Sequence, residues 1–361
     1  MTTPAAPVLL PPAGFDHFYA GGARIAALRG APVHPRRPEE WLASATTRAG
    51  QAPHGLTRLP DGTLLRDRVQ ADPVAWLGAA HVARYGGDGV ELLVKLLDAG
   101  QRLPVHVHPD REFARRHLGL AHGKTEAWVV LDAEPGAVVG LGLRRALSRE
   151  QVAALVAAHD SAALVDAVLT REVQPGDGVL VPAGTPHFIG AGVFVAEVQE
   201  PTDLSILLEW EGLAVDGDRD GHLDLGFPTA LQALDLSVWT PDHLDRHLLA
   251  ATPIQDTAAV TGTNRLRSAL PAAADPYFRA DHVGTTGAAP VRVPAGFAVL
   301  VVTGGVGELC TTAPGPDGIR TPVRGGDVAV VPWCAGDWTL TGRLDGVLCR
   351  PPAPDAPQAP R

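Results

Sequence analysis

The histidine pair His106 and His108 stands in the segment GQRLPVHVHPD (100–110), which is followed by GKTEAW (123–128) and GDGVLVPAGTPH (176–187). Because side chains alternate along a strand, two histidines one residue apart on a segment rich in valine and leucine lie on one face. Pro182 and Gly184 predict a turn that presents His187 as a third imidazole. Three imidazoles and a carboxylate suit Zn, Fe, Ni or Mn, so these segments predict a metal site.

The composition is that of an ordinary globular protein. The chain has 361 residues and 45% hydrophobic content, which is enough for two domains with buried cores. Its 40 glycines and 33 prolines imply many turns and favour β structure over helical bundles. A net charge of −10 disfavours nucleic acid or an anionic membrane as a partner. We therefore expect a small-molecule partner.

Cysteine usage and the N-terminus bear on location. Cys310, Cys334 and Cys349 lack metal-type spacing, so neither a disulfide framework nor a thiolate zinc site is indicated. The first residues contain no basic segment followed by an apolar one, and no later run approaches ~18 apolar residues. We expect a cytoplasmic protein without a membrane span.

Lysine is rare in this chain. Lys95 and Lys124 are the only lysines among 30 basic residues, and both lie in or beside the histidine segments. A partly buried lysine can transfer a proton, whereas arginine stays charged. Lys124 is therefore a candidate for proton transfer; chance clustering, with Lys95 merely covering apolar surface, is the alternative.

Local signals predict several elements. Asp72-Pro73 predicts a helix start, with the helix running to about Tyr85. Residues 38–65 suggest short strands, and apolar runs predict strands at 90–97, 129–131 and 138–143. A capping box at Ser148–Gln151 precedes apolar residues at helical spacing, which predicts a helical hairpin, and a further helix is expected at 228–234.

Residues 275–350 predict a second β unit, with turns at Gly304-Gly305 and at 325–327. Within it, VRGGDVAVVP (323–332) repeats VQPGDGVLVP (173–182), which predicts the same strand-turn-strand structure in both places. The second copy continues with Trp333-Cys334 and has no histidine at the position of His187. We therefore assign the second unit a packing role without metal.

The spacing of these motifs resembles the paired signatures of the cupin superfamily: glycine, five residues and His106-x-His108, then glycine, five residues and Pro182-x-Gly184-x-x-His187. More of the chain resembles class I mannose-6-phosphate isomerases, in the runs PEEW (38–41), LVKLLDA (93–99), VHPD (107–110) and GKTE (123–126), and in Glu197-x-Gln199. The resemblance covers roughly residues 38–210, and the second unit fits the family's two-barrel layout. It implies a zinc enzyme that interconverts an aldose phosphate and a ketose phosphate.

Carried over to this chain, the resemblance implies that one divalent metal is held by His106, His108, Glu126 and His187. The family usually has glutamine at the position of His106. We expect Zn²⁺, with Mn²⁺, Fe²⁺ and Ni²⁺ as alternatives. The resemblance also implies proton transfer by Lys124 and Glu197, and substrate binding by a further set: Lys95, Gln199 and Asp203.

Glu112 is the rival of Glu126 as the carboxylate ligand. It follows His108 at the spacing that generic cupins use, whereas Glu126 opens a strand-like run and matches the isomerase ligand. Because the ligand must project from a strand, we favour Glu126.

Two further positions depart from the isomerase pattern. The family's serine before the metal motif is Pro104 here, and its arginine after the last motif is Leu207. Arginine or lysine is the expected partner of a phosphate, so a free sugar such as mannose, lyxose or ribose stands beside the sugar phosphate as substrate. A phosphorylated substrate would need another basic residue, such as Arg111 or Arg219.

We expect a mainly β fold with helical insertions, built from two cupin-type β-barrels (jelly rolls), the second without metal ligands. The predicted domains are 1–220, metal-binding with a helical insertion near 148–170; 221–350, a degenerate cupin-like domain; and 351–361, a disordered tail. The predicted function is metal-dependent aldose–ketose isomerisation of mannose-6-phosphate or of a non-phosphorylated sugar. The alternatives are another metal-dependent cupin enzyme, such as a dioxygenase, and a non-catalytic sugar-binding cupin. We expect a monomer or a small homo-oligomer.

Overall fold

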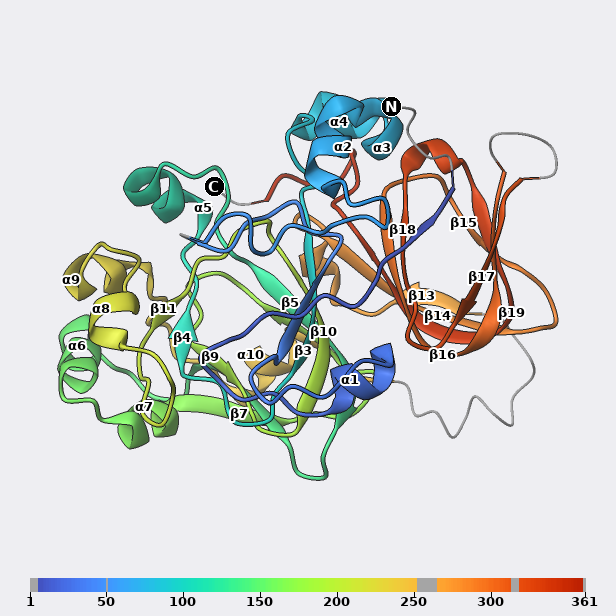
Figure 1. Ribbon diagram of the computed structural model, residues 1–361. Coiled ribbons are helices and arrows are strands. Elements are labelled where there is room, and N and C mark those ends of the chain that lie inside the picture. Colours follow the sequence, from blue (N-terminus) through green and yellow to red (C-terminus); the bar gives the residue numbers. More distant parts are fainter. Residues whose placement is uncertain (1–5, 50, 252–264, 313–317, 360–361) are drawn as a thin grey trace.

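The fold consists of three antiparallel β-sheets stacked in layers, with short helices at the outside (Figure 1). A computed structural model describes residues 6–49, 51–251, 265–312 and 318–359. The prediction of a mainly β fold with helical insertions is confirmed.

The first β unit comprises two facing sheets. The six-stranded sheet has the order β12 (Leu248–Leu249), β8 (Gly178–Val181), β5 (Glu126–Ala133), β10 (Val193–Gln199), β3 (Leu93–Asp98) and β2 (Glu39–Leu42). The five-stranded sheet has the order β11 (Ile206–Leu207), β4 (His106–Val107), β9 (His187–Ile189), β6 (Val138–Leu143) and β7 (Val168–Glu172). Apolar side chains of both sheets, among them Trp128 and Leu141, form one core between them.

The second β unit is an eight-stranded sheet that curls around a core of its own (Figure 1). Its strands are β1 (Val8–Leu9), β13 (Arg265–Ser268), β14 (Arg279–Thr286), β15 (Val291–Val293), β16 (Ala298–Thr311), β17 (Arg320–Arg324), β18 (Val328–Val331) and β19 (Trp338–Arg350). The N-terminal strand β1 pairs with β18, so the start of the chain completes a sheet made from its end.

The two units are joined by a shared core. Alternate side chains of the six-stranded sheet, such as Val94 and Val129, point away from the first unit and pack against Val299 and Val330 of the second. The remaining side chains on the same strands, such as Leu97 and Trp128, point into the first unit. The six-stranded sheet is therefore buried on both faces, and its strands are mostly apolar for that reason.

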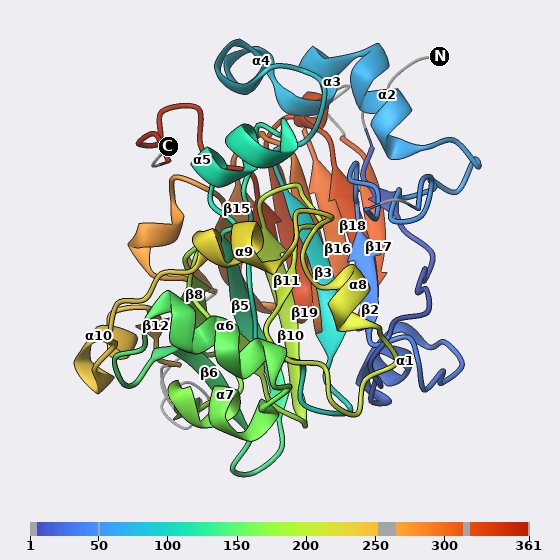
Figure 2. The ribbon, with the colours of Figure 1, turned by 90° about the vertical axis from the view of Figure 1, so that its left-hand side faces the viewer.

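Helices cover the outer face of the five-stranded sheet (Figure 2). The capping box predicted at Ser148 is present, and the predicted helical hairpin forms as α6 (Arg149–Ala157) and α7 (Ser161–Ala167). The helix predicted at 228–234 is confirmed as α9 (Phe227–Ala230) with the 3-10 turn η2 (Leu231–Ala233). Other short helices are α1 (Arg24–Arg29), α5 (Arg111–Phe113), α8 (Gly217–Asp220) and α10 (Pro241–Asp245), with a π-helical turn, η1 (Ala114–Leu118), and 3-10 turns, η3 (Ala272–Ala274) and η4 (Trp333–Ala335).

The helix predicted from Asp72 to Tyr85 begins as expected but is broken. The Asp72 side chain caps it by accepting a hydrogen bond from the Ala75 amide at 3.2 Å. It forms as α3 (Pro73–Leu77) and α4 (Ala79–Tyr85), because Gly78 takes a φ of 88° that ends the first segment. A further helix, α2 (Leu65–Ala71), precedes it, and in 38–65 the only named strand among the described residues is β2.

One predicted turn of the second unit is confirmed and one is wrong. Residues 325–327 form the turn between β17 and β18. Gly304 and Gly305 instead lie inside β16, where the pairing with β19 shifts register between Val302 and Gly304. The glycines therefore mark a bulge in a long strand, a local signal that sequence alone does not distinguish from a turn.

The predicted tail begins with anchored residues. The Pro351 and Ala353 carbonyls accept hydrogen bonds from Arg279 Nε at 3.1 Å and from the Tyr85 hydroxyl at 3.0 Å. Residues 360–361 lie outside the described residues. Within the described part of the chain, no helix is both long and apolar enough to cross a bilayer.

Candidate metal centre and its cavity

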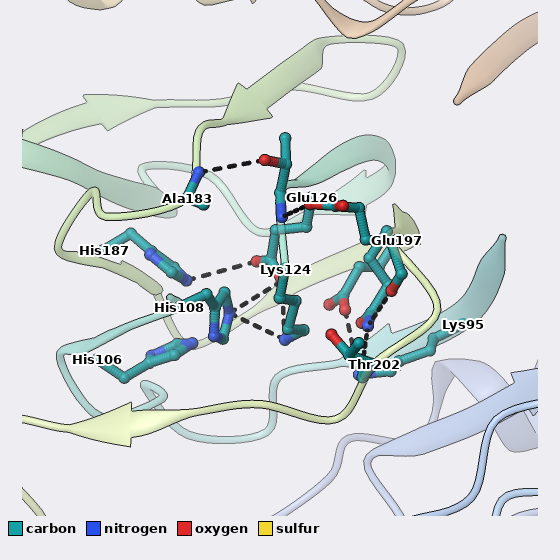
Figure 3. A network of polar contacts seen from close by, with 12 residues as sticks. Lys95, His106, His108, Lys124, Glu126, Ala183, His187, Glu197 and Thr202 are labelled. Atoms are coloured by element: carbon teal, nitrogen blue, oxygen red, sulfur yellow. Dashed lines mark hydrogen bonds and ion pairs between the residues drawn. The ribbon is translucent and has the colours of Figure 1, made fainter. Parts of the chain in front are cut away.

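Three buried histidines of the first unit lie close together (Figure 3). His106 on β4 stands directly opposite His187 on β9, and His108 follows β4. Their ligand atoms all lie within 4.8 Å of one another. The turn that carries His187 depends on Gly184, whose φ is 87°, as the sequence pattern predicted.

Backbone carbonyls orient two of the rings. His106 Nδ1 lies 2.8 Å from the Pro104 oxygen, and His187 Nδ1 lies 2.7 Å from the Thr185 oxygen. Because a carbonyl only accepts, each Nδ1 carries the hydrogen and each Nε2 keeps its lone pair. Hydrogen bonds of this kind hold the imidazoles of metal sites in place.

Glu126 reaches the histidines from the facing sheet. As the first residue of β5, it places Oε2 3.0 Å from His108 Nε2 and Oε1 3.4 Å from His187 Nε2. The Lys124 amine lies 2.9 Å from both Glu126 Oε2 and His108 Nε2. Glu112 instead lies on α5, with a side chain 49% exposed and an ion pair to Arg116. Glu126, and not Glu112, therefore lies beside the histidines.

The electrostatics of this cluster suit a divalent cation. Burial holds the pKa of His106 well below its usual range and lowers the pKa of His108 to about 3, so both rings are neutral at pH 7. Burial alone would raise the pKa of Glu126, but Lys124 and His108 hold it well below its usual range. Neutral imidazoles and a carboxylate make a donor set that fits a metal ion, and the Lys124 ammonium is attracted to the same electron-rich atoms.

A buried row of charges lies beside the cluster. Lys95 on β3 pairs in register with Glu197 on β10, and its amine lies 3.2 Å from Glu197 Oε1 and 3.6 Å from Glu39 Oε2. Burial and the charge of Glu126 raise the pKa of Glu197 to about 6, although Lys95 acts in the opposite direction. Glu197 is thus a carboxylate that exchanges a proton near neutral pH.

Members of the cluster and of the row of charges line one cavity. His17, Tyr19 and Glu39 also line it, and the sequence had assigned no role to any of these three. Glu39 accepts hydrogen bonds from the Tyr19 hydroxyl and, at 2.8 Å, from Trp41 Nε1. His17 Nε2 lies 3.3 Å from Glu39 Oε2. The alternation Glu39-x-Trp41 on β2 was the available signal, since it places both side chains on one face. His17 and Tyr19 lie between β1 and α1, outside any regular element, and carry no such signal.

The cavity contains most of the residues to which the sequence had assigned roles. Its lining includes Glu39, Lys95, Leu103, Pro104, His106, Lys124, Glu126, Ile189, Glu197, Asp203, Ser205 and Leu207. Asp203 Oδ2 accepts a hydrogen bond from the Ala49 amide at 3.1 Å. Gln199 is fully buried and is not among the residues that line the cavity, and its amide donates to the backbone carbonyls of Glu200 and Thr202.

Comparisons with known proteins agree with this geometry. No family model matches the chain. The chain is 28% identical over 315 residues to mannose-6-phosphate isomerase of Streptococcus mutans, covering 85% of this chain and 86% of that protein. It is also 28% identical over 267 residues to mannose-6-phosphate isomerase of Bacillus subtilis, covering 73% and 75% respectively.

Solved structures extend the likeness to the whole fold. The crystal structure of the Bacillus subtilis mannose 6-phosphate isomerase superposes with a TM-score of 0.69 at 21% identity, covering 95% of this chain and 99% of that one. A mutant of phosphomannose isomerase from Salmonella typhimurium superposes with a TM-score of 0.71 at 15% identity, covering 96% and 100%. This chain is therefore similar in sequence to mannose-6-phosphate isomerases and shares the fold of their solved structures.

Proposed function

We propose that this protein is a metal-dependent aldose–ketose isomerase. The observation that carries the proposal is the buried cluster of His106, His108, His187 and Glu126, which opens into the same cavity as Lys124 and Glu197. The relatives that cover most of the chain are named mannose-6-phosphate isomerases, which supports this reaction over that of a dioxygenase or a binding protein.

We propose that the histidines and Glu126 bind one divalent ion, with Zn²⁺ as the first choice and Mn²⁺, Fe²⁺ or Ni²⁺ as alternatives. When bound, such an ion supplies Lewis-acid stabilisation of negative charge on the sugar oxygens. The orphaned lone pair of His187 Nε2, which has no hydrogen-bond partner, supports this assignment.

Isomerisation moves one hydrogen between the first two sugar carbons and one proton between their oxygens. Glu197, with a pKa of about 6, takes the proton from the carbon next to the carbonyl and returns it to the neighbouring carbon. Lys124 moves the second proton between the two oxygens, from a position 2.9 Å from Glu126 Oε2. Lys95 holds Glu197 in place from 3.2 Å.

Sugar hydroxyls need partners along the cavity wall. We propose that Asp203 and Lys95, which both line the cavity, orient them. Gln199 acts indirectly: its amide holds the segment that leads from Glu200 to Asp203 and so positions Asp203.

The decisive measurement is ketose formation from mannose and from mannose-6-phosphate by metal-loaded protein, before and after chelation. We expect turnover that disappears on chelation and returns with added metal. Absence of isomerisation with every common aldose, phosphorylated and free, in zinc- and manganese-loaded samples would refute the proposal. Oxygen consumption without sugar turnover would favour the dioxygenase instead.

We also propose a cytoplasmic location, because the three cysteines, Cys310, Cys334 and Cys349, form no disulfide among the described residues. Fractionation of the producing cells tests it. Light scattering behind a sizing column tests the expected monomer or small homo-oligomer.

A further inference from the structure

We propose that the sugar accepted by this cavity is neutral, a free aldose that carries no phosphate. This inference rests on the proposed isomerase function and specifies its substrate class. It follows from the excess of carboxylates on the cavity wall and from the apolar residues that line the wall near the histidines.

The cavity wall carries more acidic than basic groups. Four carboxylates line it, from Glu39, Glu126, Glu197 and Asp203, against two ammonium groups, from Lys95 and Lys124. A bound divalent ion would only balance this excess. A phosphate dianion would therefore add negative charge to a buried site without an unbalanced positive charge, and the repulsion between like charges would weaken its binding.

The charge of each ammonium group is already paired with a buried carboxylate. Lys95 lies between Glu197 Oε1 at 3.2 Å and Glu39 Oε2 at 3.6 Å. Lys124 contacts Glu126 Oε2 and His108 Nε2, each at 2.9 Å. Withdrawing either lysine would leave a buried carboxylate without its partner, which is strongly unfavourable.

The rest of the wall near the histidines is apolar. Leu207 stands directly opposite His106 in the β4–β11 pair, so the two side chains share one face. Leu103, Pro104 and Ile189 line the same cavity. Among these side chains there is no hydrogen-bond donor, so this surface suits the carbon face of a sugar and offers a phosphate nothing.

Arginines outside the cavity have other partners. Arg111 Nε lies 2.6 Å from the buried Glu200, and its guanidinium stacks on Tyr277. Arg219 pairs with Asp220 at 2.7 Å on the surface. No arginine in the described part of the chain lines the cavity. The two arginines considered from sequence as substitute phosphate ligands therefore do not reach the site in this structure.

A neutral sugar suits the same wall. Hydroxyl groups donate hydrogen bonds, and Asp203 and Glu197 present carboxylate oxygens while Ser205 presents a hydroxyl. Such groups recognise a free sugar without any cation beyond the metal.

The test compares kcat/KM for mannose, lyxose and ribose with kcat/KM for mannose-6-phosphate in one metal-loaded preparation. We expect at least one free aldose to be preferred by about tenfold or more, since a buried polar mismatch alone discriminates by that much. A thermal-shift measurement gives a second readout: the preferred aldose should raise Tm, and the phosphate ester should not at the same concentration.

A gain-of-function variant sharpens the test. Leu207→Arg should raise the relative kcat/KM for mannose-6-phosphate by about tenfold or more, because it adds a fork of donors beside His106. The matched control, Leu207→Met, keeps the site apolar and should retain the wild-type preference.

The outcomes separate the two proposals. If mannose-6-phosphate alone is isomerised, the substrate inference is overturned while the isomerase function stands. If no sugar of either kind is turned over, the isomerase function itself fails. The wild-type comparison decides the matter even if Leu207→Arg does not fold.

Discussion

The turn at residues 173–182 and its repeat at 323–332 have the same backbone and different uses. In the first, the Gln174 amide donates to Asp177 Oδ2 at 3.0 Å, and in the second the Arg324 amide donates to Asp327 Oδ2 at 2.9 Å. Each turn also docks on a neighbouring strand, through Gly176 to Val130 and through Gly326 to Val302, both at 2.8 Å. The predicted internal repeat is therefore confirmed down to individual hydrogen bonds.

The strands that follow preserve this correspondence. Val181 pairs with Glu126 in the first unit, and Val331 pairs with Ala298 in the second. Two residues further along the strand from Glu126, Trp128 pairs with Glu197. Two residues further along from Ala298, Leu300 pairs with Leu348. The carboxylates of the first unit thus correspond to apolar residues in the second.

The position of His187 corresponds to Asp337, which accepts a hydrogen bond from the Ala295 amide at 3.0 Å instead of facing other ligands. This difference shows that turn residues and strand alternation determine the shared strand-turn-strand structure. A few side chains that point inward from these strands decide whether a unit contains a charged site or an apolar core.

The largest expected effect comes from removing His187. His187→Ala should lower metal affinity by at least about 100-fold, because even losing a partner of a ligand costs 10–100-fold. Asp337→Ala, at the matching position of the second unit, should leave metal content unchanged. Metal stoichiometry after dialysis measures both, and one ion per chain retained by His187→Ala would refute the ligand assignment.

A smaller but still large effect is expected at Glu197. Glu197→Gln should lower kcat by about 10²- to 10⁴-fold, the usual contribution of a proton-transfer group. In the unchanged protein the carboxylate becomes protonated as pH falls through about 6, so kcat/KM should decline below that pH.

The decline of kcat/KM below about pH 6 should be absent in Glu197→Gln. The matched control is Leu348→Met, at the corresponding position of the second unit. It should keep both the wild-type kcat and the decline of kcat/KM at low pH. An unchanged pH profile in Glu197→Gln would argue that another group titrates.

The second unit should respond to core mutations in stability alone. Leu348 is 1% exposed, and Leu348→Ala should lower the free energy of unfolding by about 2–5 kcal/mol through cavity formation. Urea unfolding measures this loss. Below the unfolding transition, metal content and kcat should stay near wild type, and a selective loss of metal would show that the second unit does more than pack.

The smallest expected effect distinguishes the repeated turns themselves. Asp177 is 4% exposed and also accepts a hydrogen bond from the Ala251 amide at 2.7 Å. Asp177→Ala should therefore cost about 1–3 kcal/mol of unfolding free energy, because it removes two partly buried hydrogen bonds from backbone amides. Asp327→Ala, in the more exposed turn, should cost about 0.5–1.5 kcal/mol. Equal losses in urea unfolding would contradict this ranking.

Sequence alone was enough for features that depend on local spacing. It predicted the His106-x-His108 alternation, the capping box at Ser148 and the repeated turns. Side-chain alternation, caps and turns depend on only a few neighbouring residues. Residue type alone also singled out Lys95 and Lys124, since no other lysine competes with them.

Only the tertiary structure decided what these residues meet. Glu39 and Glu197 come from opposite ends of the first unit's sequence, yet both contact Lys95, and Leu207 stands across from His106 through strand pairing. The bulge at Gly304 and the core shared by the two units are likewise invisible locally. The physical reason is that alternation fixes which face a side chain takes, whereas register and sheet stacking, which depend on distant segments, select its neighbours.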